Sequence, residues 1–138
     1  MAEPLILDTH VFIWLMNGSK ELSDRTRQMI DAHVRKAPLM LPAISLWEIA
    51  MLSASGRIIL SKPTKDWLEE ALEAPAIELL PLTPEIAIES ANLPGGFHGD
   101  PADRLIVASA RVQQNALLTR DQRILDYAKD GYLTGVKV

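Results

Sequence analysis

The sequence contains no cysteine, so the chain can form neither a disulfide framework nor a thiolate site. This absence fits a reducing compartment, and we expect the protein in the cytoplasm. The N-terminus also lacks the basic and apolar regions of a signal peptide. No apolar run approaches the roughly 18 residues that cross a bilayer, so we expect no membrane association.

Aromatic residues and positive charge are scarce as well. Only 5% of the residues are aromatic, and the net charge is −4. Proteins that coat nucleic acid without sequence preference are usually basic, and an extended base-stacking platform needs aromatic rings. If this chain binds nucleic acid, it must therefore do so through a local basic rim or a metal ion.

The composition that remains is globular, with 48% hydrophobic and 23% charged residues in a chain of 138. A chain of this length is expected to form one domain, residues 1–138, with a core of its own. Short apolar runs predict five strands, at residues 5–7, 38–42, 77–82, 116–119 and 132–138. Amphipathic runs predict helices that start near residues 11, 23, 45, 64, 83, 100 and 121.

The alternation of strands and helices predicts an α/β fold, with helices on both faces of a central, mostly parallel sheet. Folds of this kind bind ligands at the carboxyl ends of the strands. Asp8 directly follows the apolar run Leu5–Leu7, which places its carboxylate at that edge. Either Asp8 has a functional role there, or it caps a helix that starts at Thr9 or His10.

Other acids also fall at predicted strand ends or helix starts, namely Glu48, Asp100, Asp103 and Asp121. Because these ends share one edge of a parallel sheet, the carboxylates could converge. Converging carboxylates repel one another, and a divalent cation that prefers oxygen ligands would relieve the repulsion. Such a site can polarise a phosphoryl oxygen and activate water, so the candidate chemistry is hydrolysis of a phosphodiester.

Each of these acids also has a purely structural interpretation. Ser45 with Glu48 matches a capping box, and so does Thr119 with Gln122. Asp100 matches an N-cap before a proline. Asp103 and Asp121 match ordinary acids in the first turn of a helix. The structural interpretations do not explain why all the acids fall at ends expected on one edge.

Four motifs, in order, resemble those of PIN domains, and in particular of the VapC-type toxins of bacterial and archaeal toxin–antitoxin pairs. They are Leu7-Asp8-Thr9-His10, Ser45-x-x-Glu48, Asp100-Pro101-x-Asp103-Arg104 and Thr119-Arg120-Asp121. The resemblance extends over nearly the whole chain. It implies a PIN-like, Rossmann-like α/β/α sandwich and an endoribonuclease that depends on Mg²⁺ or Mn²⁺.

The resemblance also implies roles for the acids. It assigns catalytic positions to Asp8, Glu48, Asp103 and Asp121. Asp8, Asp103 and Asp121 would hold one or two cations, directly or through water, with Asp100 as an outer-shell ligand. Glu48 would complete the shell or act as general base.

Further side chains near these acids have two interpretations each. Thr9 would orient the first acid or a metal-bound water, or it would cap a helix. Arg104 and Arg120 each follow or precede an acid, and we interpret them first as partners of that neighbouring carboxylate and second as ligands of an RNA phosphate. His10 and His98 are interpreted as a helix-start and a loop histidine, because an oxygen-only site needs no imidazole.

For partners, the resemblance implies an RNA substrate, a cognate VapB-type antitoxin that inserts into the active-site groove, and a homodimer. Residues 11–16 and 46–52 carry apolar side chains on more than one helical face. Either the helix around Trp67 covers them or a partner does.

Two other functions remain as alternatives. The first is a PIN-like module that binds RNA or protein without catalysis. The second is a Mg²⁺-dependent phosphatase with an aspartyl nucleophile, which would require a second Asp where this chain has His10.

Overall fold

The structure is a computed structural model that describes residues 3–138. Within these residues the chain forms a five-stranded sheet of order β3-β2-β1-β4-β5, in which every neighbouring pair is parallel. The strands are β1 Leu5–Leu7, β2 Leu39–Pro42, β3 Ile77–Leu80, β4 Leu117–Thr119 and β5 Gly135–Lys137. The predicted α/β fold with a parallel sheet is thus confirmed.

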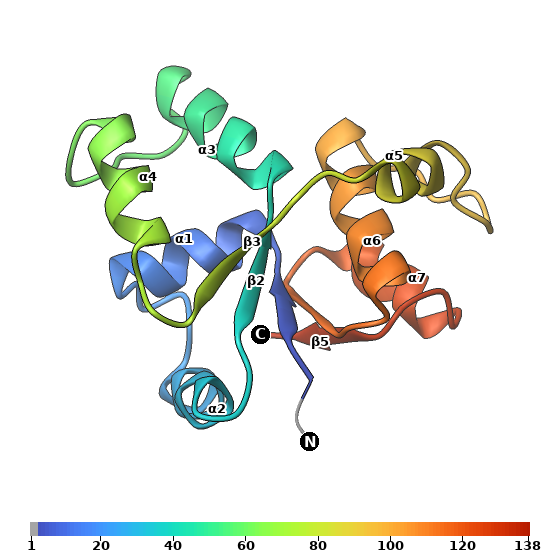
Figure 1. Cartoon of the computed structure of the whole chain (residues 1–138), viewed down its shortest axis with the longest axis horizontal. Coiled ribbons are helices and arrows are strands. Elements are labelled where there is room, and N and C mark those ends of the chain that lie inside the picture. The colour runs from blue at the N-terminus through green and yellow to red at the C-terminus, as the bar shows by residue number, and fades with distance from the viewer. Residues whose placement is uncertain (1–2) are drawn as a thin grey trace.

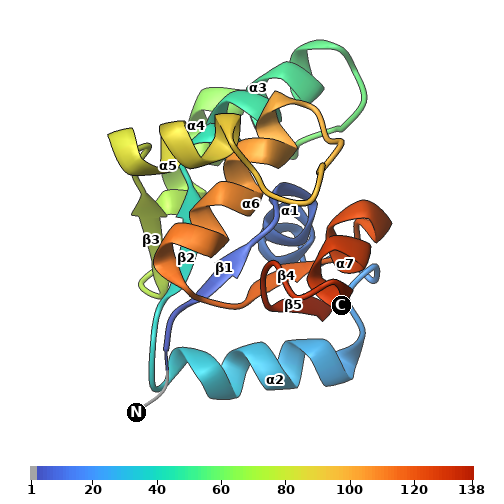
Figure 2. The ribbon, with the colours of Figure 1, turned by 90° about the vertical axis from the view of Figure 1, so that its right-hand side faces the viewer.

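Seven helices in the described part of the chain cover the two faces of this sheet (Figure 1). They are α1 Thr9–Asn17, α2 Asp24–Val34, α3 Ile44–Ala54, α4 Thr64–Leu72, α5 Pro84–Ala91, α6 Pro101–Gln113 and α7 Gln122–Lys129. The first four lie on one side, and α5, α6 and α7 face the viewer on the other side in Figure 2.

The central strands divide their side chains between the two cores. Leu7 and Leu118 pack in the core under α1 to α4, whereas Ile6 and Leu117 pack in the core under α5 to α7. All four side chains are fully buried. Successive residues of a strand point to opposite faces, so a run of apolar residues is needed where both faces are covered.

Most helix starts follow local sequence signals. The side chains of Ser23, Thr83 and Asp100 each accept a hydrogen bond from the backbone N–H three residues on, which makes them N-caps. β3 ends two residues before the predicted boundary, because Pro81 has no N–H for a further ladder bond.

Three hydroxyl residues near helix starts do not cap those helices, and each makes a tertiary contact. Ser45 lies inside α3, which has no side-chain cap. Thr64 begins α4, and its hydroxyl lies 2.8 Å from the hydroxyl of Ser53 rather than capping the helix. Thr119 ends β4, and its hydroxyl donates to the carboxylate of Asp8.

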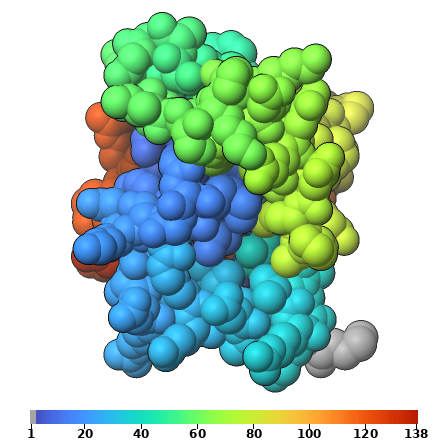
Figure 3. All heavy atoms as spheres, turned by 90° about the vertical axis from the view of Figure 1, so that its left-hand side faces the viewer, coloured from blue at the N-terminus to red at the C-terminus, as the bar shows by residue number. Residues whose placement is uncertain are grey.

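The apolar surface of α1 is covered within the chain, and that of α3 is covered only in part. Trp67 on α4 is buried, meets Phe12 edge-on at 5.9 Å between ring centroids, and donates from its indole N–H to Asn17. In Figure 3, α1 lies between α3 and α4 above and α2 below. On α3, Trp47 and Met51 remain 53% and 43% exposed. None of the helices in the described part of the chain is long and apolar enough to cross a membrane.

Replacing Leu118 by alanine tests this core. Leu118 on β4 is fully buried and packs in the core under α1 to α4. We expect Leu118→Ala to lower the free energy of unfolding by about 2–5 kcal/mol, measured by urea denaturation. Ile88→Ala is the control, because Ile88 is 65% exposed, and it should change stability by less than about 0.5 kcal/mol. Equal losses in both variants would contradict this arrangement.

Candidate metal centre at the carboxyl edge of the sheet

Asp8 is held at the end of the central strand by two hydrogen bonds. One carboxylate oxygen accepts from the N–H of Thr9 at 2.8 Å, which makes Asp8 the N-cap of α1. The other oxygen accepts from the hydroxyl of Thr119 at 2.6 Å. Burial raises the pKa of Asp8, although these hydrogen bonds act against the shift. Asp8 is therefore a helix cap and also a buried acid at the carboxyl edge of the sheet.

Glu48, Asp100 and Asp103 form a tight group of acids from two helices. Each offers a carboxylate oxygen, and these oxygens all lie within 4.8 Å of one another. Oxygen ligands on opposite sides of Mg²⁺ are about 4 Å apart, because each lies about 2 Å from the ion. The spacing and the all-oxygen donor set therefore fit a hard divalent cation after small side-chain adjustments.

All five acids singled out from the sequence line one cavity of ≈ 480 Å³. Its wall carries the carboxylates of Asp8, Glu48, Asp100, Asp103 and Asp121. They arrive from four places in the chain: the β1–α1 junction, α3, the start of α6 and the β4–α7 junction. Asp8 and Asp121 share the cavity but lie outside the tight group of three.

Burial and the crowding of acids raise the pKa of Asp103. Burial raises the pKa of this carboxyl to about 7, and the charges of Asp100, Asp121, Asp8 and Glu48 add to the shift. Burial also raises the pKa of Glu48; the hydroxyl of Thr9 acts against this shift, and the charge of Asp8 adds to it. The cavity therefore favours protons on its acids, or a cation among them.

The two capping boxes that the sequence allows, Ser45 with Glu48 and Thr119 with Gln122, are not formed among residues 3–138. α3 begins after Ala43 without a side-chain cap, so Glu48 does not serve as the second half of a box. At α7, Asp121 itself is the cap, and its carboxylate accepts from the N–H groups of Arg123 and Ile124 at 2.8 and 3.3 Å. Asp100 caps α6 as predicted, through the N–H of Asp103.

Thr9 does not cap a helix. Its hydroxyl lies 2.8 Å from that of Ser45, and both residues are fully buried. This hydroxyl pair joins the first turn of α1 to the first turn of α3, and thus the helices that carry Asp8 and Glu48.

The two arginines beside the acids do not pair with those acids, so our preferred interpretation of them was wrong. Arg104 donates to the backbone carbonyls of Ser90 and Phe97 at 2.9 and 2.8 Å, which ties down the loop before α6. Consecutive residues of a helix point in different directions, so Arg104 turns away from its neighbour Asp103.

Arg120 also finds its partners elsewhere. It forms an ion pair with Glu21 at 2.6 Å and donates to the carbonyl of Val138 at 2.9 Å. Its guanidinium lies 4.4 Å from the ring centroid of Trp14. These contacts join the end of the chain at Val138 to α1, and within residues 3–138 no arginine pairs with Asp121.

The histidines lie outside the tight group of acids. His10 is exposed on α1 and lines the cavity, and His98 is exposed in the loop before α6. Sequence reasoning missed one basic residue of the cavity wall, Arg57, which follows the glycine after α3.

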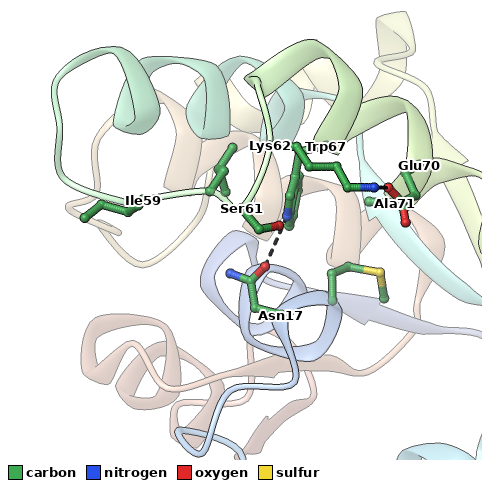
Figure 4. A pocket seen from close by; sticks show the side chains of 9 residues that line it. Asn17, Ile59, Ser61, Lys62, Trp67, Glu70 and Ala71 are labelled. Carbon is green, nitrogen blue, oxygen red and sulfur yellow. Dashed lines mark hydrogen bonds and ion pairs between the residues drawn. The ribbon is translucent and has the colours of Figure 1, made fainter.

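A second cavity, of ≈ 520 Å³, lies between α1 and α4 (Figure 4). Trp67 and Ala71 line it together with Asn17, which accepts the indole hydrogen bond of Trp67. Its one acid, Glu70, is paired with Lys62. This cavity therefore lacks the converging acids that the first one has.

Comparisons with known proteins agree with the fold. The PIN domain model matches residues 5–130. Ribonuclease VapC22 of Mycobacterium tuberculosis is 37% identical over 120 residues, which cover 87% of this chain and 88% of that protein.

Solved structures share the fold at lower identity. In the VapBC2 complex of Rickettsia felis bound to a promoter DNA fragment, one chain matches with a TM-score of 0.71 and 15% identity, over 97% of this chain and 98% of that one. A chain of the FitAcB structure from Neisseria gonorrhoeae matches with a TM-score of 0.64 and 22% identity, over 95% of each chain.

The raised pKa of Asp103 predicts how stability depends on pH when no cation is bound. The pKa of Asp103 is about 7 in the folded chain against an ordinary value of 3.8, so the folded state binds more protons between these pH values. The free energy of unfolding should therefore fall as pH rises from about 4 to about 7. Asp103→Asn removes this titration and should be more stable than wild type near pH 8, by on the order of 1–2 kcal/mol after allowance for partial solvation.

Urea denaturation with EDTA, near pH 5 and near pH 8, measures the effect. The stability difference between Asp103→Asn and wild type should grow with pH. Asp24→Asn is the matched control, because Asp24 is exposed in the first turn of α2 and does not line the cavity. A difference that is the same at both pH values would contradict the prediction.

Proposed function

The chain belongs to the PIN-domain family, and we propose that it is a metal-dependent endoribonuclease, the toxin of a VapBC-type toxin–antitoxin pair. The observation that carries this proposal is the group of three carboxylates, Glu48, Asp100 and Asp103, whose oxygens lie within 4.8 Å of one another in a shared acidic cavity. The 37% identity to a ribonuclease over most of the chain supports it.

We assign Mg²⁺ or Mn²⁺ to this cavity. Asp103 would be one of its ligands, because it belongs both to the acids that the motifs assign to the cation and to the tight group of three. Glu48 and Asp100 flank it. Asp8 and Asp121 would bind the same cation through water or would hold a second one. When bound, the cation would polarise a phosphoryl oxygen and lower the pKa of a water molecule.

The chain's own groups fix where the reaction takes place. Thr119 and the N–H of Thr9 hold the carboxylate of Asp8, so its oxygens face the cavity in one orientation. The Thr9–Ser45 pair holds α3 against α1 and sets the position of Glu48. Glu48 makes no capping bond, so its carboxylate can complete the cation's shell or accept a proton from the attacking water.

For partners, we propose an RNA substrate, a VapB-type antitoxin and a homodimer. One solved structure that shares the fold is a toxin–antitoxin complex from Klebsiella pneumoniae. The exposed Trp47 and Met51 on α3 offer apolar surface for a protein partner. The chain would act as a single PIN domain in the cytoplasm.

Cation binding should appear as thermal stabilisation. A cation that binds only the folded state at about ten times its Kd should raise the Tm of wild type by roughly 4 °C. Asp103→Asn should lose most of this rise, whereas Asp24→Asn should keep it. Scans near pH 8 with Mg²⁺, Mn²⁺ or EDTA measure it. Equal shifts in wild type and Asp103→Asn would exclude Asp103 as a ligand.

RNA cleavage tests the function itself. Asp8→Asn should lower the rate by at least about a hundredfold, because asparagine still caps α1 but carries no charge for a cation. Its amide oxygen can still accept from Thr9, so the fold should remain. Purified, antitoxin-free protein is assayed on single-stranded RNA with Mg²⁺ or Mn²⁺, with an EDTA control and Asp24→Asn as the matched variant. Wild-type protein that cleaves no RNA would favour the non-catalytic binding module.

A further inference from the structure

The end of α3 directs a basic residue to the acidic cavity. Gly56 follows the helix with φ +75°, a left-handed conformation that glycine adopts without strain. Its N–H donates to the carbonyl of Ser53 at 3.1 Å, and the N–H of Arg57 donates to the carbonyl of Leu52 at 2.9 Å. These two bonds form a Schellman motif. The backbone of Arg57 is therefore fixed beside the helix that carries Glu48.

Arg57 lines the cavity of the five acids but, among residues 3–138, is not bonded to any of them. Arg57 is exposed, and among residues 3–138 its guanidinium has no hydrogen bond or ion pair with another residue. An arginine offers five N–H donors in a planar fork that matches phosphate oxygens. All of these donors are available to a ligand.

The other arginine of the cavity wall is already occupied. Arg120 binds Glu21 and the carbonyl of Val138, and its guanidinium lies over Trp14. Arg104, which follows Asp103, binds two backbone carbonyls and is not part of the wall. Arg57 is therefore the arginine of this wall that can bind a ligand without giving up an internal contact, within the described residues.

An RNA strand at the acidic cavity needs a positively charged side chain in addition to the cation. The chain has a net charge of −4, and the cavity concentrates carboxylates, so a polyanion is repelled wherever the cation does not act. A cation among the acids can attract the phosphate that is cleaved. The next phosphate along the strand lies beyond its ligands and needs a separate positive charge.

We propose that Arg57, held at the cavity rim by the Schellman turn at Gly56, binds an RNA backbone phosphate adjacent to the one that is cleaved. This inference rests on the proposed nuclease function. Arg57 is thus a substrate-binding residue, and its contribution lies in RNA affinity rather than in the chemical step.

Steady-state cleavage of a single-stranded RNA tests this assignment. Arg57→Gln should raise KM about tenfold, the loss of one charge-assisted hydrogen bond to phosphate, with kcat changed less than about twofold. Arg57→Lys keeps the charge but loses the planar fork of donors, so its KM should lie between those of wild type and Arg57→Gln. Arg25→Gln is the matched control, because Arg25 is exposed on α2, away from the cavity, and it should match wild type.

The salt dependence of RNA binding gives a second readout that needs no turnover. In an Asp8→Asn background with Mg²⁺, the slope of log Kd against log salt should be smaller by about 0.7 when Arg57→Gln is added, as expected for one lost phosphate contact on single-stranded RNA. Arg57→Lys and Arg25→Gln should keep the slope of the background.

The outcomes separate the two proposals. If wild type cleaves no RNA but the slope falls with Arg57→Gln, the nuclease function fails and the phosphate site stands. If wild type cleaves and Arg57→Gln leaves both KM and the slope unchanged, the phosphate site is refuted. A fall in kcat at constant KM and slope also refutes it, because Arg57 would then serve only as a counter-charge to the acids.

Discussion

A carboxylate buried at the end of the central strand is the constraint on which the rest of this edge depends. Asp8 is only 8% exposed, and a buried charge needs hydrogen-bond donors. The N–H of Thr9 and the hydroxyl of Thr119 supply them, and the same Thr119 oxygen accepts from the N–H of Asp121 at 3.0 Å. The donors that satisfy Asp8 thus also position the start of α7.

Helix ends reduce the cost of bringing the other acids close. α1, α6 and α7 each begin with a capping aspartate at this edge, so the positive ends of three helix dipoles point toward the acids. Each end is worth about 0.3–1 kcal/mol to a nearby carboxylate. That does not offset the burial and mutual repulsion around Asp103, whose pKa still reaches about 7. The remaining repulsion is what a divalent cation would relieve.

The sequence predicts those features that depend on neighbours along the chain. Alternating runs predict the parallel sheet, and a parallel sheet brings residues after its strands to one edge. Ser23 and Thr83 cap their helices through bonds that span three residues, so they could be found. Ser45 and Thr119 instead bind hydroxyl and carboxylate groups 36 and 111 residues away, which no local pattern reveals. The ion pair between Arg120 and Glu21 also joins residues that are far apart in the chain, so no local pattern predicts it either.

Structural and functional roles coincide at this edge, so a capping role does not argue against a catalytic one. Asp100 caps α6 through one carboxylate oxygen and still contributes an oxygen to the group with Glu48 and Asp103. A cap fixes the carboxylate on a rigid helix, which is the preorganisation that a metal site requires. A substitution that keeps the cap and removes the charge, such as asparagine for aspartate, therefore separates the two roles where alanine would remove both.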